Sequence, residues 1–239
     1  MPKQDLNGKV ALITGANSGI GRAIAERLST NGVKVALAAR TADNLGIEDS
    51  LSRSVDVRDL TDVEAFAHET AERFGRIDIL VANAGVGHMG EFLGVPAQRV
   101  QEMIETNFAG TVNAVRAALP HLLKNDTGDI LAVASEAGRR GLPYEAAYSA
   151  SKFGQVGFIK AMDHELRSKG IRATNLCPGG VATNFAVGEG RGREEGSPVL
   201  DAMMQAEDIA DLAEFVLTRP ARYRILEVAL RSMSESSWG

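Results

Sequence analysis

Short apolar segments that alternate with amphipathic ones predict an α/β fold, a doubly wound parallel sheet of about seven strands with helices on both faces. Six of the expected strands are almost continuously apolar, as is typical of strands covered on both faces. The first strand is followed by a glycine-rich turn and then by an amphipathic helix. At 239 residues, 44% of them hydrophobic, we expect one domain over residues 1–239.

The strands are expected at residues 10–13, 33–39, 54–57, 77–82, 129–134, 171–177 and 224–230. Apolar side chains at helical spacing predict helices from Ile20 onward and over residues 62–74, 99–123, 148–169 and 208–217. We expect Pro120 to bend or break the third of these near its end. In such sheets ligands bind beyond the carboxyl ends of the strands.

Two connections depart from this regular alternation. Residues 40–53 are too few for a comfortable crossover helix with two loops, so we expect a stunted helix or a bare loop there. Residues 184–204 hold four glycines among glutamates and arginines, a composition that suits a mobile segment. We therefore expect a mobile substrate loop over residues 183–206.

The glycine-rich turn predicts a Rossmann-type dinucleotide site. The turn consists of Thr14, Gly15, Ala16, Asn17, Ser18, Gly19, Ile20 and Gly21. Glycines let the backbone approach a pyrophosphate where a Cβ atom would collide. The free N–H groups at the start of the following helix then point at the negative charge. By itself such a turn is weak evidence, because many strand-to-helix corners contain glycine for backbone reasons.

Composition argues against several other classes of function. The formal net charge of −5 gives no broad basic field, so we expect neither a nucleic-acid nor a membrane partner. No apolar run approaches the ~18 residues that suggest a membrane span, and the first residues lack the apolar core of a signal peptide. Cys177 is the single cysteine, and the four histidines show no metal spacing, so no metal site is expected. A cytoplasmic location follows by default.

Tyr148 and Lys152 are four positions apart on an expected helix and therefore share one face. A tyrosine hydroxyl titrates near ~10, and a neighbouring ammonium group lowers that pKa. Tyr148 would then serve as an acid or base near neutral pH. Ser135, just past the fifth strand, is placed to hydrogen-bond a substrate carbonyl. Alone, this Tyr/Lys spacing is weak evidence, because helix surfaces often pair the two residues.

Together these residues resemble the classical short-chain dehydrogenase/reductase family, over about residues 9–183. The matching residues, in the family's order, are the turn from Thr14 to Gly21, Asp56, Asn83-Ala84-Gly85, Asn107, Ser135, Tyr148, Lys152 and the stretch from Pro178 through Gly179 and Val181 to Thr183. Each is weak by itself, and the ordered set is specific. The shortened segment after Arg40 departs from the usual family pattern.

The resemblance implies a role for each matching residue. Tyr148 would be the general acid, and Lys152 would bind the nicotinamide ribose and lower the pKa of the tyrosine. Ser135 would orient the carbonyl, and Asn107 would hold a helix bend and a water molecule that links Lys152 to solvent. The cofactor-binding residues would be Gly15, Asn17, Ser18, Gly19, Ile20, Gly21, Asp56, Val57, Asn83, Ala84, Gly85, Tyr148, Lys152, Pro178, Gly179, Val181 and Thr183, with Asp56 at the adenine and Thr183 at the nicotinamide amide.

The end of the second strand indicates the kind of cofactor. In NAD(H) the ribose 2′-hydroxyl is free and is usually bound by a carboxylate at this position. The chain instead has Arg40, whose guanidinium N–H groups suit the 2′-phosphate of NADP(H). We therefore expect NADP(H) to be preferred over NAD(H), with a solvated surface charge as the alternative role for Arg40. His88 is the one histidine expected near the site. Arg139 and Arg140 are interpreted as solvated loop charges, with attraction of an acidic substrate as the alternative.

The function expected is reversible reduction of a ketone or aldehyde to an alcohol with NADP(H), on a small-molecule substrate. One alternative is a 3-oxoacyl-thioester reductase acting on acyl carrier protein or coenzyme A thioesters. A second alternative, which is not an enzyme, is a regulator that senses NADP(H) without turnover. The apolar residues of segment 148–169 spread over more than half of its circumference, which favours a homodimer or homotetramer through this helix. The alternative is that a loop of the same chain covers the additional apolar side of this helix.

Overall fold

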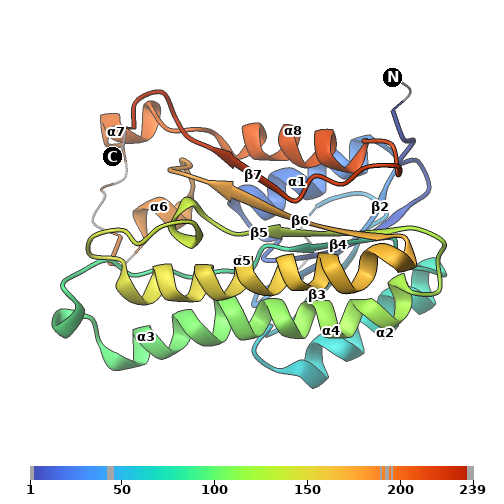
Figure 1. Cartoon of the computed structure of the whole chain (residues 1–239), viewed down its shortest axis with the longest axis horizontal. Helices are drawn as coiled ribbons and strands as arrows, with labels where there is room; N and C mark the ends of the chain where they lie inside the picture. The colour runs from blue at the N-terminus through green and yellow to red at the C-terminus, as the bar shows by residue number, and fades with distance from the viewer. Residues whose placement is uncertain (1–2, 42–45, 189, 192–193, 195, 236–239) are drawn as a thin grey trace.

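The computed structural model contains one sheet of seven parallel strands in the order β3-β2-β1-β4-β5-β6-β7 (Figure 1). The strands are β1 (Val10–Thr14), β2 (Lys34–Ala39), β3 (Leu51–Ser54), β4 (Ile79–Ala82), β5 (Gly128–Val133), β6 (Ile171–Pro178) and β7 (Glu227–Leu230). The structure describes residues 3–41, 46–188, 190–191, 194 and 196–235. The predicted doubly wound α/β fold is confirmed.

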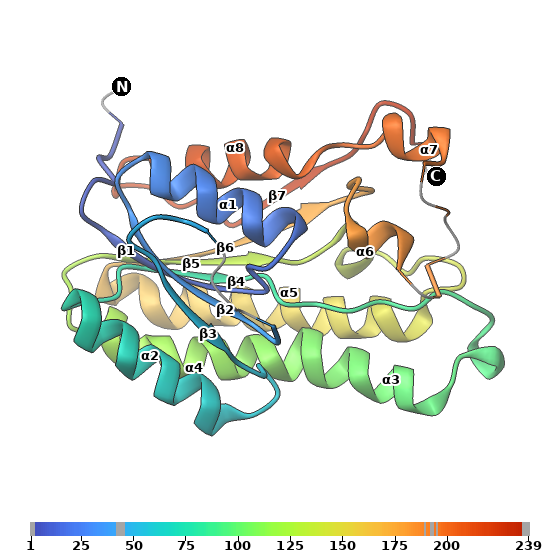
Figure 2. The same ribbon diagram turned by 180° about the vertical axis from the view of Figure 1, so that it is seen from behind.

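Helices cover both faces of the sheet (Figures 1 and 2). Helices α1 (Gly19–Thr30) and α8 (Ala206–Leu217) lie on one face, and α2 (Leu60–Phe74), α4 (Gly110–Leu122) and α5 (Ala146–Leu166) lie on the other. Successive side chains of β1 divide between the two cores, because neighbouring residues of a strand point to opposite faces. Ala11 and Ile13 pack in the α1–α8 core, and Leu12 packs in the core on the other face.

The prediction for the third strand was wrong in position, because β3 covers Leu51–Ser54 rather than residues 54–57. β3 pairs only with β2, so it is an edge strand, and its side chains are only partly buried. An edge strand needs no continuous apolar run, which is why the sequence Leu-Ser-Arg-Ser gave no signal. Val55 and Val57 are buried beyond the strand, where the chain turns toward α2.

The short connection between β2 and β3 contains no helix in its described part, residues 40–41 and 46–50. Residues 42–45, which the prediction of a stunted helix or bare loop also included, lie outside the described residues. Ile47 from this connection packs against the core that α1 and α8 form. Ile47 therefore adds apolar cover on this face of the sheet.

The expected helix over residues 99–123 is three consecutive segments. These are α3 (Ala97–Met103), a π-helical turn η2 (Ile104–Ala109) and α4. The irregularity falls at the π-helical turn and not at Pro120, which lies inside α4 just before its end at Leu122. Little of the helix follows Pro120, so a distortion there displaces little chain, whereas π-helical turns often mark functional sites.

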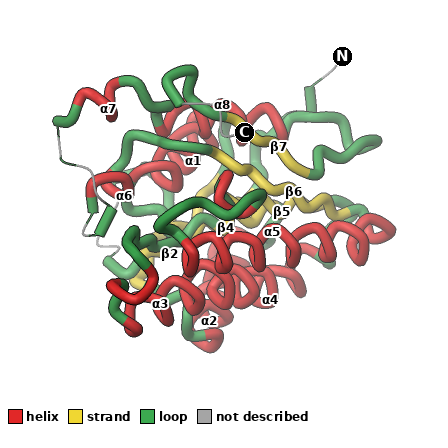
Figure 3. The backbone as a smooth tube through the Cα atoms, turned by 60° about the vertical axis from the view of Figure 1, so that its left-hand side comes forward, coloured by secondary structure: helices red, strands yellow, loops and turns green. Residues whose placement is uncertain are grey.

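The segment between β6 and α8 lies at the end of the sheet that Figure 3 turns toward the viewer. Its described residues form two short helices, α6 (Asn184–Val187) and α7 (Pro198–Asp201), and Val181 pairs with Met204 in an isolated bridge. Residues 189, 192–193 and 195 of the predicted mobile loop lie outside the described residues. That the loop moves stays a prediction. Among the described helices, none is long and apolar enough to cross a membrane.

Candidate active site

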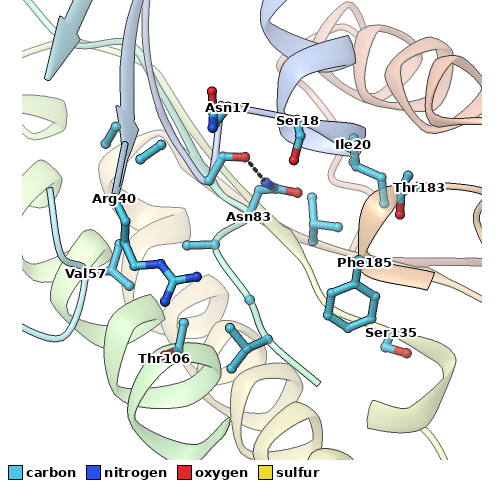
Figure 4. A pocket seen from close by; sticks show the side chains of 18 of the residues that line it. Asn17, Ser18, Ile20, Arg40, Val57, Asn83, Thr106, Ser135, Thr183 and Phe185 are labelled. Carbon is cyan, nitrogen blue, oxygen red and sulfur yellow. Dashed lines mark hydrogen bonds between the residues drawn. The ribbon is translucent and has the colours of Figure 1, made fainter. Parts of the chain in front are cut away.

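A cleft of about 310 Å³ opens at the carboxyl ends of the strands (Figure 4). The chain leaves β1 toward β2 and β3 on one side and continues with β4 on the other, so the cleft lies at the switch point of the sheet. The predicted residues that line it are Gly15, Asn17, Ser18, Gly19, Ile20, Arg40, Asp56, Val57, Asn83, Ala84, Gly85, Ser135, Tyr148, Lys152, Pro178, Gly179, Val181 and Thr183. Gly21 and Asn107 are not among the lining residues.

The glycine turn after β1 brings main chain close to two other segments. Gly15 has φ +66°, and a Cβ atom there would lie 2.8 Å from the Cα of Ala84. Gly19 has φ +54°, and a Cβ atom there would lie 3.1 Å from the Cγ2 of Thr183. Both positions therefore need glycine for backbone conformation and for space.

Gly21 lies against Asn83 and the turn and is not among the lining residues, and its contact with the cofactor stays a prediction. A Cβ atom there would collide with Asn83 Nδ2 and with the main-chain oxygen of Gly15. Asn83 Nδ2 donates to the carbonyl oxygens of Thr14, at 3.1 Å, and of Gly15, at 3.0 Å. The missing side chain at Gly21 lets the amide of Asn83 tie the end of β4 to the turn (Figure 4).

The turn and the helix after it fit the pyrophosphate of a dinucleotide. Helix α1 has no acidic residue in its first turn, so no carboxylate competes with a bound anion. The lack of a Cβ atom at Gly15 and Gly19 lets this turn pack closely against Ala84 and Thr183. If a nucleotide binds, these features would hold its phosphates.

Charged side chains gather at the far end of the cleft. The Arg40 side chain is 68% exposed, and its Nη1 lies 3.6 Å from Glu102 Oε1. Figure 4 shows it extending past Val57 toward the side of Thr106. Arg58, which also lines the cleft, pairs with Asp56 at 2.5 Å. Hydrogen bonds from Arg58 hold the pKa of the Asp56 carboxyl below its usual value.

Ser135 and Tyr148 meet at the other end of the cleft. Ser135 follows β5, and its Oγ accepts a bond of 3.1 Å from the N–H of Ala137. Tyr148 is 6% exposed, and burial raises its pKa to about 12 although a hydrogen bond with Ser135 lowers it. The predicted lowering of this pKa below its ordinary value is therefore wrong for the protein by itself, because the loss of solvation outweighs the neighbouring charges.

Lys152 is buried beside the tyrosine ring, with its Nζ 5.9 Å from the ring centroid. The Nζ atom donates to the carbonyl oxygen of Val133 at 3.1 Å and to Gln155 Oε1 at 2.9 Å. Burial lowers the pKa of Lys152 to about 8, so the ammonium form still predominates at neutral pH. Gln155, whose Nε2 donates to Thr111 Oγ1 at 3.0 Å, was not found from the sequence. A lone glutamine on a helix carries no spacing signal.

Asn107 lies in the π-helical turn and is fully buried. Its Oδ1 accepts from the N–H of Val86 at 2.8 Å, and its Nδ2 donates to the Val86 carbonyl and to Ser151 Oγ, each at 2.9 Å. Asn107 thus fastens the chain after Gly85 to helix α5 from behind the cleft. The water-mediated link to Lys152 stays a prediction.

Comparison with known proteins identifies the family. The model for short chain dehydrogenases matches residues 9–193. The chain is a short-chain dehydrogenase/reductase. It is 38% identical to a putative ketoacyl reductase of Streptomyces coelicolor, over 78% of this chain and 75% of that one. It is 33% identical, over 98% of its own length, to glycine betaine reductase ATRR of Emericella nidulans, but spans only 19% of that protein.

Solved structures agree with this assignment to the short-chain dehydrogenases/reductases. An alcohol dehydrogenase of the archaeon Thermococcus sibiricus, complexed with 5-hydroxy-NADP, has a TM-score of 0.86 at 31% identity, covering 97% of this chain and 99% of that one. A 3-ketoacyl-(acyl-carrier-protein) reductase of Brucella melitensis, complexed with NADH, has a TM-score of 0.84 at 29% identity, covering 95% and 98%. Members of the family therefore bind a nicotinamide cofactor. The first of these complexes contains an NADP derivative and the second contains NADH.

The end of the cleft at Tyr148 contains residues that sequence reasoning missed. The Phe185 ring lies 5.9 Å from the Tyr148 ring, and the Arg191 guanidinium lies 4.4 Å from the first and 5.3 Å from the second. The charge of Arg191 lowers the pKa of Tyr148, and that of Glu145 raises it. These contacts join segments far apart in the chain, so no spacing could have indicated them.

Other residues considered from the sequence have different places. Arg139 and Arg140 are ion-paired and not merely solvated, because both contact the buried Glu136, and Arg139 also contacts Glu227. His88 lines a second hollow beside the cleft. Within the described residues, no group of three or more His, Cys, Asp or Glu side chains has the arrangement of a metal site.

Proposed function

We propose that the chain is an NADP(H)-dependent oxidoreductase that reversibly reduces a ketone or aldehyde to an alcohol. The observation that carries this proposal is the meeting of Ser135, Tyr148 and Lys152 at one end of a cleft whose other end fits a dinucleotide. Family membership supports the class of reaction.

Each of these residues has a part in the proposed reaction. When bound, the nicotinamide supplies the hydride that adds to the carbonyl carbon. Ser135 holds the carbonyl oxygen, and Tyr148 donates its hydroxyl proton to that oxygen, which completes the alcohol. Burial keeps the Tyr148 phenol protonated at neutral pH, the form that reduction requires. Lys152, still charged at neutral pH, would contact the nicotinamide ribose.

The preference for NADP(H) rests on the charges at the far end of the cleft. Arg40 and Arg58 both line it there, and Arg40 is largely exposed to an incoming group. Thr41 also lies there, and its Oγ1 accepts from Asn17 Nδ2 at 3.2 Å. A 2′-phosphate would find a guanidinium fork at this position, whereas a bare hydroxyl would gain little from it.

A second candidate is reduction of 3-oxoacyl thioesters, which the similarity to ketoacyl reductases supports. A phosphopantetheine-bearing partner calls for a basic docking surface. The arginines considered for this role, Arg139 and Arg140, contact Glu136, which weakens the case for docking at that place. Small-molecule carbonyls are therefore the first choice.

A substrate panel with NADPH, repeated with NADH, tests the proposal. We expect NADPH oxidation with members of a set of aldehydes, ketones and 3-oxoacyl thioesters, at a rate that Tyr148→Phe reduces by about a hundredfold or more because the proton donor is lost. Consumption is followed by the nicotinamide absorbance. Nucleotide binding without turnover of any compound would favour the sensing regulator, and Tyr148→Phe would then leave binding unchanged.

We also propose that the protein is a homodimer or homotetramer through α5. Phe153, Gly157 and Ala161 follow one another at four-residue spacing along this helix, and all are exposed. Phe153 is 46% exposed. Such an apolar row on a helix whose opposite side is already packed supports contact with a second copy. The cytoplasmic location stays a prediction.

A further inference from the structure

A second hollow, of about 300 Å³, adjoins the cofactor cleft. The two hollows share Arg40, Gly85, Val86 and Phe185 among their lining residues, so they lie side by side along the loop that follows β4. The second hollow therefore runs beside the cleft, with Arg40 near one end and with Phe185 and Arg191 near Tyr148. The proposed function does not yet assign a ligand to this hollow.

Arg191 lines this hollow and also lies next to the proposed proton donor. Its side chain is 6% exposed, and its guanidinium carbon is 5.3 Å from the centroid of the Tyr148 ring. Phe185 packs on the same guanidinium at 4.4 Å. If a carbonyl compound binds at Tyr148, the guanidinium of Arg191 would thus lie only a few carbon–carbon bond lengths from its carbonyl group.

The surrounding chain makes room for this arginine. A Cβ atom at Gly87 would collide with Arg191 Nη1 and would lie 2.8 Å from the Phe185 ring. Next to Arg191, the carbonyl of Gly190 accepts a bond of 2.5 Å from the N–H of Met89. The loop after β4 and the segment after α6 are therefore fitted to each other around the guanidinium.

The charges around the hollow favour an anion. Among the described residues that line it, Arg40, Arg99 and Arg191 are cationic and Glu102 is anionic. Glu102 contacts Arg99 at 2.9 Å and Arg40 at 3.6 Å. Glu145 forms an ion pair with Arg191 at 3.7 Å. A ligand carboxylate would add the charge-assisted, forked contact that guanidinium groups form well.

We propose that Arg191 binds a carboxylate on the substrate, and that the carbonyl compounds reduced at Tyr148 are short oxo acids. This inference rests on the proposed function. The anion-binding residue near the reacting carbonyl is thus Arg191, whereas Arg139 and Arg140, the arginines that follow Ser135 in the chain, contact Glu136 and Glu227. Arg191 is a specificity residue, and Ser135 and Tyr148 act on the carbonyl whether or not the acid is present.

The test compares short 2-, 3- and 4-oxo acids with their methyl esters as substrates, each with saturating NADPH. We expect the wild-type protein to have a higher kcat/KM for an acid than for its ester. Arg191→Met should lower this acid-to-ester ratio by about tenfold to a hundredfold, the loss of hydrogen bonds to a charged group. Arg191→Lys, which keeps the charge without the fork, should have an intermediate effect.

Further variants separate the proposed contact from a general effect on folding. Gly87→Ala should displace the guanidinium and lower the ratio, whereas Glu145→Gln should raise it by removing a competing carboxylate. Arg73→Met, which removes one charge from an exposed position near the end of α2, should leave it unchanged. An equal loss for acid and ester in Arg191→Met would mean that the arginine only packs the site, and the proposal would be wrong.

Titration calorimetry keeps this inference distinct from the proposed reaction. If no carbonyl compound is reduced, the proposed function fails, and binding of the same oxo acids and esters decides the inference alone. Acid binding that Arg191→Met weakens, with no change for the ester, would support the anion subsite. Equal binding of acid and ester by the wild-type protein would overturn it.

Discussion

Arg40 is the residue on which the proposed preference between two cofactors depends. It extends from the end of β2, where no carboxylate stands, and its contact with Glu102 is a long one at 3.6 Å. Arg40 is exposed and Glu102 also pairs with Arg99, so a phosphate could replace Glu102 as the partner of Arg40 at small cost. The same guanidinium offers little to a ribose hydroxyl.

At this residue, Arg40→Ala should raise the KM for NADPH by about tenfold or more and change the KM for NADH by less than about twofold, because only the phosphate loses its partner. Initial rates with one carbonyl substrate measure both constants. Arg73→Ala, at an exposed position on α2, serves as the control. Equal effects on the two cofactors would rule out the phosphate role.

The strand–turn–helix element from β1 to α1 depends on contacts with the residues that end β4. Asn83 bonds the turn through its side chain, and the Thr14 hydroxyl accepts from the N–H groups of Asn83 and Ala84. Gly21 leaves the space that this amide occupies. The shape of the phosphate-binding turn is therefore set by β4 as much as by the turn itself.

This arrangement predicts that Gly21→Ala lowers nucleotide affinity although position 21 does not line the cleft. The added methyl group would push Asn83 away from the turn, and we expect at least about a tenfold rise in the dissociation constant, with lower thermal stability. Fluorescence or calorimetric titration with NADPH measures the affinity. Gly141→Ala is the matched control, because nothing lies within 4 Å of a Cβ atom there. Unchanged affinity in Gly21→Ala would contradict this role for Asn83.

At the scale of the whole molecule, helix α5 has a buried side and an exposed side that serve different purposes. Its buried side packs Val156 and Ile159 into the protein and carries Tyr148 and Lys152 to the cleft. Its outward row contains the exposed Phe153, which the described residues of the same chain leave partly open. The broad apolar arc seen in the sequence is thus only partly explained by the fold of one chain.

We expect Phe153→Glu to convert the proposed homodimer or homotetramer to smaller species, because like charges would face each other across a symmetric contact. Light scattering coupled to size exclusion gives the mass in solution. Leu93→Glu, at a residue 98% exposed outside α5, should leave the mass unchanged. A monomeric wild-type protein would show that the exposed row serves another purpose.

The spacing of residues was enough to predict most of the cleft. Parallel strands end at a common edge, so Gly15, Asn83, Ser135 and Thr183 had to come together once the alternation of strands and helices was recognised. The edge strand β3 was misplaced because its sequence is mostly polar. The close contact of Gly21 with Asn83 could not be predicted, since spacing says that a glycine is needed but not which neighbour needs the space.

By itself the sequence determined the fold class, the family and the set of residues at the switch point, because these follow from local periodicity and from motifs short enough to read along the chain. Tertiary structure alone decided that Lys152 bonds Gln155, that Arg191 lies against Tyr148, and that the tyrosine pKa rises to about 12. These properties depend on burial and on contacts between distant segments, and removal from water changes the free energy of a charge more than any single neighbour in the sequence does.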